Sequence, residues 1–348
     1  MNTTLKDVAA LAGVSIATAS LALNDGYGVN VNTKEKVVQA AHKLNYVQSS
    51  VGRNLITGKS NTIGLYILNS RNNPDLTGEC SYFYSILRGV LSVAQQNGYS
   101  LSFCVKTWEE IETSNFFALR SRDRSNDGMI IIPQYNYHYS FLQDLEKYDF
   151  PYIIFNPNTT TNKSKRISLN NYLGARLATR HLINLGIDSI GFINGPENHY
   201  DAVVRERGFL EELVQGEKVK AEEKWFERGD FTTKSGYEAM ERILKGGTPP
   251  NGIFCSNDYM AAGAIQALYD NNYRVPDDVA VVGYDNTDIA LSIYPHLTTV
   301  INPTFDFGRL AMERLLRLIN GERDFEEIIV EPELIIRGST QKIKLNDK

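Results

Sequence analysis

Apolar side chains at the start of the chain recur at helical spacing. Four of them form one stripe before Gly13, namely Leu5, Val8, Ala9 and Ala12. Thr4 and Asp7 have the spacing of a capping box, with aspartate as a shorter substitute for glutamate. Glycine tolerates the left-handed conformation in which many helices end, so Gly13 predicts the end of a first helix.

Two further short helices are predicted before residue 47. Ser15 can cap the first of these, which runs to about Leu23 and is followed by the turn signal Asn24-Asp25-Gly26. Thr33 can cap the other, from 34 to 45. The small core is expected to contain Val14, Val37, Val38, Ala41 and Leu44.

From Asn61 onward the pattern changes to short apolar strands that alternate with amphipathic helices. The expected strands are 62–68, 101–105, 128–132, 151–155, 167–169, 189–193, 224–226, 252–255 and 279–283. The expected helices are 82–97, 174–185, 201–214, 234–244 and 260–271. Such alternation predicts an α/β fold of parallel sheets covered by helices on both faces, and its length favours two lobes.

Charge is distributed unevenly between the two parts of the chain. The 348 residues have a formal net charge of -5, but residues 1–60 contain six basic and three acidic residues and so carry +3, which leaves -8 for the rest. A basic head on an acidic body can present one face to nucleic acid. The first residues lack the order of a signal peptide and no stretch is apolar enough to span a membrane, so we expect a cytoplasmic protein.

The motifs of common enzyme and metal chemistries do not occur in the sequence. It contains neither a glycine-rich dinucleotide fingerprint nor a P-loop, and neither a serine nucleophile elbow nor a zinc-binding H-E-x-x-H helix. The five histidines are scattered, and Cys80, Cys104 and Cys255 form no C-x-x-C pair. We therefore expect a protein that is not an enzyme, with no metal, no cofactor and three reduced thiols.

Two short helices joined by a glycine-containing turn are the plan of the helix-turn-helix, whose second helix enters the major groove of DNA. The segment from Leu5 to Asn24, LKDVAALAGVSIATASLALN, resembles the headpiece signature of the lactose/galactose repressor (LacI/GalR) family. The resemblance implies a DNA-binding headpiece over residues 1–47. It also implies a homodimer, because two operator half-sites need two heads.

The same resemblance implies which headpiece residues contact DNA. Ile16, Ala17 and Leu21 lie where family members read bases, although Ile16 and Leu21 could instead be core residues. Hydroxyl groups lie where family members contact phosphates, at Thr4, Ser15, Thr18 and Ser20. The family often has arginine where Leu21 stands, and leucine cannot grip guanine with two hydrogen bonds. We therefore expect an operator that differs from the common half-site at that base pair.

Residues 48–60 join the head to the body. Their composition alone is that of a flexible linker, because a helix of about eight residues is marginal in water. The resemblance instead implies a hinge helix that orders on the operator, with Leu55 wedged into the minor groove and Arg53 near a phosphate. Gly52 and Gln48-Ser49 depart from the family pattern, so folding of this hinge should cost more.

The body resembles the family from 61 to 338, most clearly over 254–263, 274–286 and 295–300. This implies the two-lobed fold of periplasmic sugar-binding proteins, with a ligand between the lobes at the carboxyl ends of strands. The expected effector domain is 61–340. Its N-lobe is expected over about 61–160 plus 292–322, and its C-lobe over about 161–291 plus 323–340.

Seven positions match the effector-binding positions of the family: Tyr82, Phe83, Asn156, Arg205, Phe231, Asn257 and Asp285. Each has an alternative role in the fold itself. Asp285 could cap a helix or stabilise a turn, and Arg205 could form an ion pair with Glu206 or Glu211 on a solvated face. The three aromatic residues could be part of the core.

We therefore expect a sequence-specific transcriptional regulator that represses genes of carbohydrate metabolism. A homodimer would bind a palindromic operator, and a small sugar-like effector would control its affinity. The chain has no leucine heptad after Gly338, which favours a dimer over a tetramer. The alternatives are a nucleobase or a phosphorylated carrier protein as effector, a sugar-binding transport protein, and an α/β enzyme acting on sugars.

Overall fold

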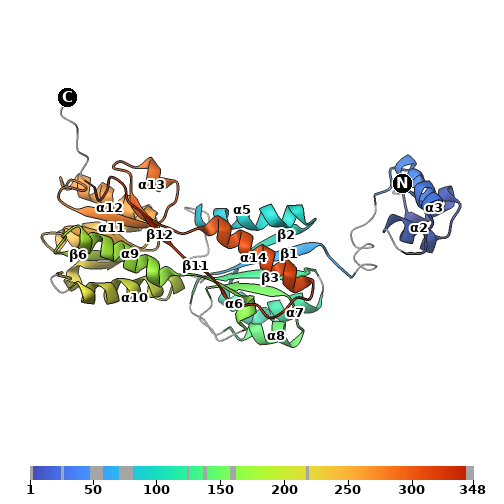
Figure 1. The fold of residues 1–348 in the computed structure, drawn as a ribbon, viewed down its shortest axis with the longest axis horizontal. Coiled ribbons are helices and arrows are strands. Elements are labelled where there is room, and N and C mark those ends of the chain that lie inside the picture. Colours follow the sequence, from blue (N-terminus) through green and yellow to red (C-terminus); the bar gives the residue numbers. More distant parts are fainter. Residues whose placement is uncertain are drawn as a thin grey trace, which may run out of the picture. The chain divides into compact units, whose positions relative to one another are not determined.

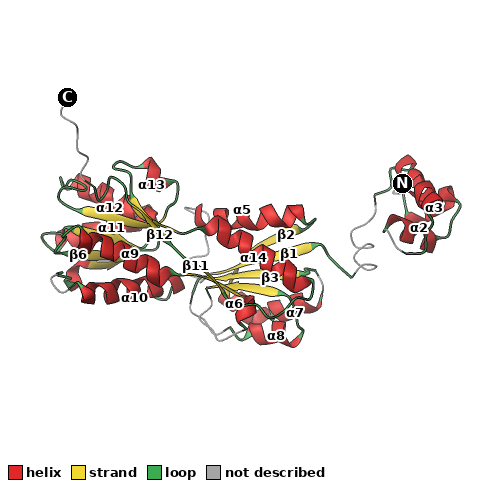
Figure 2. Cartoon of the chain, in the orientation of Figure 1, coloured by secondary structure: helices red, strands yellow, loops and turns green. Residues whose placement is uncertain are grey.

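The computed structural model describes residues 3–24, 27–47, 58–69, 81–123, 125–135, 139–156, 162–216 and 219–341. The chain divides into two compact units, 1–60 and 61–348, which are called here the head and the effector domain (Figure 1). The head consists of helices, and the effector domain combines two sheets with helices around them (Figure 2). The expected α/β fold class is thereby confirmed.

The head contains three helices, α1 (Leu5–Ala12), α2 (Ile16–Leu23) and α3 (Val31–Lys43). Thr4 and Asp7 form the predicted capping box, and Gly13 ends α1 with a φ of 69°. Ser15 caps α2 by accepting a hydrogen bond from the Thr18 amide at 3.0 Å. The shared core of these helices contains Val8, Ala9, Ala19, Ala22, Val37, Ala40 and Ala41.

Two predictions for the third helix were wrong. It begins at Val31 rather than at residue 34, because the Asn30 side chain caps it by accepting from the Thr33 amide at 2.8 Å. Asparagine is a stronger capping residue than threonine, so it sets the earlier start. Val38 is 36% exposed, and Ala40 takes the expected place of that side chain in the core.

The N-lobe is a sheet in the order β11-β5-β4-β3-β1-β2, with every pair parallel. Its strands are β1 (Thr62–Asn69), β2 (Ser100–Thr107), β3 (Gly128–Pro133), β4 (Tyr152–Phe155), β5 (Arg166–Leu169) and β11 (Ile328–Val330). Helices α5 (Ser81–Gln96) and α14 (Thr304–Ile319) cover one face. Helices α6 (Trp108–Ser114), α7 (Phe116–Arg122) and α8 (Phe141–Lys147) cover the other.

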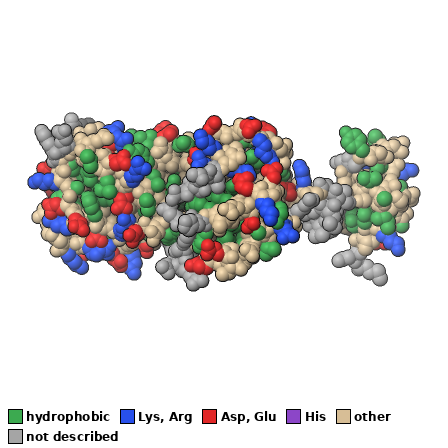
Figure 3. Space-filling model, turned by 90° about the horizontal axis from the view of Figure 1, so that it is seen from below, with side chains coloured by type: hydrophobic (Ala, Val, Ile, Leu, Met, Phe, Trp, Pro, Cys, Tyr) green, Lys and Arg blue, Asp and Glu red, His purple; other side chains and the backbone are tan. Residues whose placement is uncertain are grey.

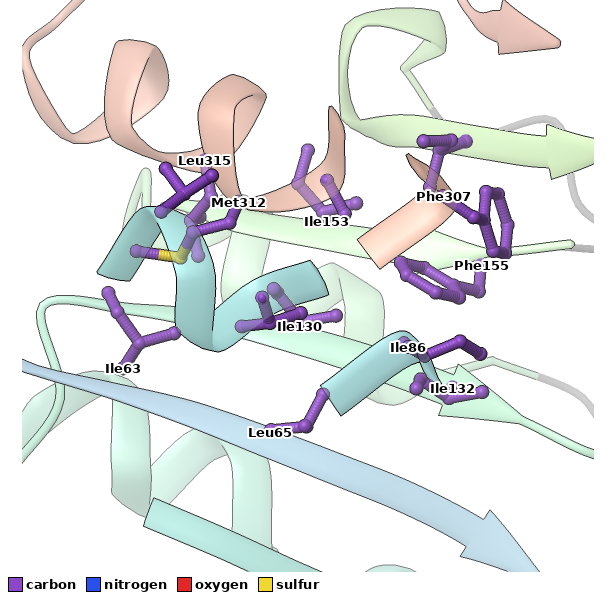
Figure 4. Close-up of a cluster of buried hydrophobic side chains, with 14 of the residues drawn as sticks. Ile63, Leu65, Ile86, Ile130, Ile132, Ile153, Phe155, Phe307, Met312 and Leu315 are labelled. Carbon is purple, nitrogen blue, oxygen red and sulfur yellow. The ribbon is translucent and has the colours of Figure 1, made fainter. Parts of the chain in front are cut away.

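Side chains that alternate along the N-lobe strands fill the hydrophobic cores on the two faces of the sheet. On β1, Ile63 and Leu65 face α5 and α14, where they meet Ile86 and Met312 (Figure 4). Tyr66 lies in the opposite core with the side chains of α6 to α8. Burial on both faces explains why these strands are nearly continuous apolar runs in the sequence.

The C-lobe sheet has the order β12-β10-β9-β8-β6-β7, in which only the β10–β12 pair is antiparallel among the described residues. Its strands are β6 (Ile190–Asn194), β7 (Phe226–Arg228), β8 (Gly252–Cys255), β9 (Ala280–Asp285), β10 (Thr298–Ile301) and β12 (Glu333–Ile335). Helices α9 (Asn171–Asn184) and α10 (Tyr200–Gln215) cover one face. Helices α11 (Thr233–Lys245) and α12 (Asp258–Asp270) cover the other, and the short α13 (Ile289–Ser292) follows β9.

The chain crosses between the lobes at positions that differ from the expected boundaries. Strands β5 and β11 belong to the N-lobe sheet, although residues after 160 and after 322 were expected in the C-lobe. Strand β10 belongs to the C-lobe sheet, although 292–322 was expected in the N-lobe. The strand expected at 224–226 begins instead at Phe226, because a 3₁₀ turn (Glu223–Trp225) directs Trp225 into the core.

Charges of both signs alternate over the visible face of the effector domain, without a field of one sign (Figure 3). Cys255 is buried and Cys104 is partly buried, and both are free thiols. Cys80 lies outside the described residues. Within the described part of the chain, no cluster of three histidine, cysteine, aspartate or glutamate side chains could hold a metal ion.

Candidate functional site

Helix α2 leaves an apolar face exposed in the head. Ile16 is 49% exposed and Leu21 is 42% exposed, and Ala17 beside them is exposed as well. Ala19 and Ala22 on the opposite side of the helix are buried. Packing in the head's core therefore does not account for Ile16 and Leu21, and the face is free to meet a ligand surface.

The hydroxyl groups expected at phosphates also serve the helix caps. The Thr4 hydroxyl donates to Asp7 at 2.7 Å, which uses its proton within the capping box. The Ser15 and Thr18 hydroxyls lie 2.8 Å apart, so one of their two protons stays available for an external acceptor. Ser20 is partly buried. Arg53 and Leu55, the two residues expected to contact DNA from the hinge, lie outside the described residues.

The centre of the effector domain is a guanidinium group buried between carboxylates. Arg205 on α10 is 2% exposed, and its Nη2 lies 3.3 Å from Asp285 Oδ1 and 3.8 Å from Asp201 Oδ2. Its Nε donates to Asn171 Oδ1 at 2.9 Å, and its Nη1 donates to the Ser256 carbonyl. The Tyr284 ring lies 3.8 Å from the guanidinium carbon. The alternative of a solvated ion pair with Glu206 or Glu211 is wrong, because these bind Arg228 and Arg207.

Burial and opposite charge compete at this cluster. Burial raises the pKa of Asp201 and of Asp285, and the neighbouring Arg205 charge acts against that rise. Burial also raises the pKa of Tyr82, and the charges of both carboxylates raise it further. The positive charge of Arg205 thus favours ionisation of two carboxyl groups that burial alone would keep protonated.

Asp285 ends β9 in a left-handed conformation with a φ of 98°, and it caps no helix, since Asp288 precedes α13. Its Oδ1 accepts from Arg205 and, at 3.2 Å, from Asn302 Nδ2. Its Oδ2 accepts no hydrogen bond from the described residues. Asp285 and Tyr82 both line a cleft of about 240 Å³ between the loop after β9, the start of α5 and the residues before α14. The unused carboxylate oxygen is suited to bind a hydroxyl.

The other expected effector residues are in part structural. Phe231 has a φ of 71°, and Asn257 donates to its carbonyl at 2.9 Å while capping α12. Asn156 at the end of β4 accepts from the Leu169 amide at 2.8 Å and donates to Asp201 across the lobes at 3.1 Å. Tyr82 and Phe83 meet edge to face, and both pack on the N-lobe core. The structure therefore joins Arg205, Asp285 and Tyr82 in one place, with Asn156 connected through Asp201.

Three residues of this cluster were not predicted from the sequence. Asn171 is fully buried and bonds both Arg205 and Asp201, at 2.9 Å each. Asp201 was expected only as the first residue of a helix. Asn302 was expected only as part of the N-lobe, with no role at the site. The available signal was a polar residue at the amino end of a helix or just before it, which is more often a cap.

Comparisons with known proteins agree with both units of the chain. Residues 4–49 match the family described as bacterial regulatory proteins, lacI family, and residues 179–340 match a periplasmic binding protein-like domain. Over 341 residues the chain is 32% identical to the HTH-type transcriptional repressor PurR of Mannheimia succiniciproducens, which covers 98% of this chain and 99% of that protein.

The chain belongs to the LacI family. This LacI-family protein is also 30% identical, over 345 residues, to the probable HTH-type transcriptional repressor ExuR of Bacillus subtilis, with 98% of the chain and 99% of the relative covered. Its fold is similar to that of the lac repressor dimer bound to operator and the anti-inducer ONPF, with a TM-score of 0.85, 26% identity, and coverage of 98% and 100%. The fold is also similar to that of the transcriptional regulator CelR in complex with cellobiose. That comparison has a TM-score of 0.70 and a sequence identity of 29%, and it covers 97% of this chain and 100% of the CelR chain.

Membership of the LacI family makes this chain a DNA-binding transcriptional regulator, as expected from its headpiece. In the described residues no single helix is long and apolar enough to cross a membrane. Helices α1 and α2 taken together, bent by 100°, pass the same length and composition test. Both pack into the core of the head.

Proposed function

We propose that this LacI-family chain represses transcription in the cytoplasm, that it binds a palindromic operator as a homodimer, and that a small hydroxylated effector controls its affinity. The Asp285 carboxylate, which lines the cleft and pairs with the buried Arg205, carries the effector part of this proposal. Guanidinium and carboxylate groups in a sheltered cleft form strong, directional hydrogen bonds with hydroxyl groups. The CelR–cellobiose structure, similar in fold, has such a polyhydroxylated ligand.

In the head, we assign base contacts to Ile16, Ala17 and Leu21, and phosphate contacts to the hydroxyl groups beside them. The exposure of Ile16 and Leu21 supports this assignment, because the core of the head does not enclose these two side chains and both can meet a base edge. Contacts of this kind suit thymine methyl groups.

Control by the effector requires that it prefers one arrangement of the lobes. Helix α10 of the C-lobe carries both Arg205 and Asp201, and Asp201 bonds Asn156 of the N-lobe at 3.1 Å. An effector that hydrogen-bonds Asp285 and Arg205 changes the balance of charge at Asp201, and thereby the contact between the lobes. In a dimer, this movement would change the spacing of the two heads.

Operator affinity measured with and without ligand tests the proposal. A palindromic duplex selected from random DNA is titrated with the full chain by fluorescence anisotropy, at fixed salt, with cellobiose, D-ribose, glucose 6-phosphate or hypoxanthine. We expect a sugar to change the operator Kd at least fivefold, and Asp285→Asn to abolish that change. Asp188→Asn is the control, because Asp188 is exposed and precedes β6, at the opposite end of the sheet.

A response to none of these ligands, or an unchanged response in Asp285→Asn, would contradict the assigned site. A response to hypoxanthine alone would keep the regulator and replace the sugar with a nucleobase.

A further inference from the structure

A second cleft lies on the N-lobe, among the helices α6, α7 and α8 that cover one face of its sheet (Figure 1). Its volume of about 410 Å³ exceeds the 240 Å³ of the cleft beside Asp285 and is typical of small-molecule sites. The cleft exists because the helical chain breaks at Asn115, which separates α6 from α7 in a left-handed conformation with a φ of 48°. A hollow remains between these two short helices and the first turn of α8.

Aromatic side chains form much of the lining of this cleft, namely Trp108, Phe116, Phe117 and Phe141. The rings of Phe117 and Phe141 are stacked with their centroids 4.5 Å apart, and the Trp108 ring lies 5.8 Å from that of Phe141. All four side chains also pack in the N-lobe core, so the lining is fixed in place. Aromatic rings have partial negative charge on their faces, which attracts cations.

The charged groups that line the cleft are both carboxylates. Glu112 on α6 is exposed and Asp144 on α8 is half-buried, and no lysine or arginine lines the cleft with them. Neither carboxylate has an ion pair or a hydrogen bond to another side chain within the described part of the chain. Their oxygen atoms are therefore available to a ligand that donates hydrogen bonds.

The nearest basic side chains are already paired with carboxylates outside the cleft. Lys106 and Arg120 lie over the Phe116 ring, 5.9 Å and 5.5 Å from its centroid. Lys106 pairs with Glu110 at 3.7 Å, and Arg120 pairs with Asp123 at 3.1 Å. These two positive charges are thus balanced locally, and the negative charge of the cleft itself is not.

We propose that this cleft binds a small organic cation, an ammonium group attached to an apolar body. The ammonium donates hydrogen bonds to Asp144 and Glu112, and the apolar body packs against Trp108 and Phe141. Charged hydrogen bonds and attraction between the cation and the rings together favour such a ligand over a neutral one of the same size. The site lies within one lobe and does not depend on the proposed sugar effector.

Fluorine NMR of the full chain, labelled with 5-fluorotryptophan, tests this site without DNA or sugar. Trp108 lines the cleft, whereas Trp225 lies in the C-lobe core and serves as the internal control. Trp225→Phe assigns the two signals. We expect phenethylammonium to shift the Trp108 signal with a Kd of about 1 mM or lower, and the uncharged 2-phenylethanol to bind at least about tenfold more weakly.

Two variants test the role of the carboxylates. Glu112→Gln combined with Asp144→Asn should weaken phenethylammonium binding about tenfold and leave 2-phenylethanol binding unchanged. Glu326→Gln is the control, because Glu326 is exposed in the same lobe and does not line the cleft. An unshifted Trp108 signal, equal affinities for the amine and the alcohol, or equal losses in the double variant and the control would overturn the proposal. A double variant that instead changed the association of two copies of the chain would assign the cleft to their contact and overturn it as well.

Discussion

Removal of the Arg205 guanidinium tests the charge balance at the centre of the effector domain. Arg205→Met keeps most of the side-chain length but removes the donors to Asn171, to the Ser256 carbonyl and to Asp285. It also leaves Asp201 and Asp285 buried without their cation. Breaking a buried ion pair from one side typically costs about 3–5 kcal/mol, because the remaining charge has no compensation. We expect a loss of this size in the free energy of unfolding at pH 7.5.

The loss should depend on pH with a defined sign. Burial raises the pKa of both carboxyls in the folded state, and removing Arg205 raises it further. A carboxyl with a raised folded pKa stabilises the fold below its unfolded pKa of about 3.9, and this contribution disappears as the pH rises through the folded value. The deficit of Arg205→Met should therefore be smaller at pH 5 than at pH 7.5.

The chain offers a specific signal and a matched control for this measurement. Its two tryptophans, Trp108 and Trp225, lie in the two lobes, so urea unfolding followed by tryptophan fluorescence reports on the effector domain alone. Arg207→Met is the control, because Arg207 is on the same helix but its side chain is 74% exposed. Surface pairs of this kind contribute little. A loss below about 1 kcal/mol in Arg205→Met, with the pH profile of the wild type, would refute the reasoning.

Three further predictions concern the head and the C-lobe. Leu21→Arg should shift the operator selected from random DNA toward guanine at one position of each half-site, and an unchanged selected sequence would count against α2 as the reading helix. Gly13→Ala should lower the melting temperature of the head, because a φ of 69° costs a residue with a Cβ atom about 1–2 kcal/mol, although no neighbouring atom would clash with that Cβ. Circular dichroism of the unfolding of the head measures this change, and an unchanged melting temperature would contradict the predicted backbone strain. Burial raises the pKa of Asp258 to about 7, so the contribution of the protonated Asp258 carboxyl to the free energy of unfolding should decline as the pH rises from about 4 to above 7. Asp258→Asn should flatten this part of the dependence of stability on pH. An equally steep dependence in the variant would mean that another group titrates.

The sequence predicted those elements whose pattern is determined by burial on both faces. Strand β8 was predicted with its observed limits, and β1 within one residue at its end, because runs such as 62–68 contain no charged residue, asparagine or proline that could indicate a turn. The capping box of α1 was predictable because its signal lies within four residues. The start of α3 was not, because both Asn30 and Thr33 can cap a helix and only the competition between them decides.

For the short strands next to the crossings between the lobes, the sequence does not indicate which of the two sheets each strand joins. Strands β5, β10 and β11 have three or four residues each, and their apolar content fits either sheet. The polar cluster was predicted only in part for a similar reason. Arg205 and Asp285 were expected from the family resemblance, but Asn171 and Asn302 come from segments that meet Arg205 and Asp285 only after the chain has crossed between the lobes.

The central claim is that this chain recognises a particular duplex through its head, and comparison of two affinities tests it most directly. The full chain is titrated by anisotropy, in one buffer of fixed salt, with the palindrome enriched by selection and with a scrambled duplex of equal length and composition. A LacI-family regulator should bind the palindrome about a thousandfold more tightly or better. Equal affinity for both duplexes, falling in parallel as salt is added, would reduce the head to a nonspecific basic surface and contradict the account.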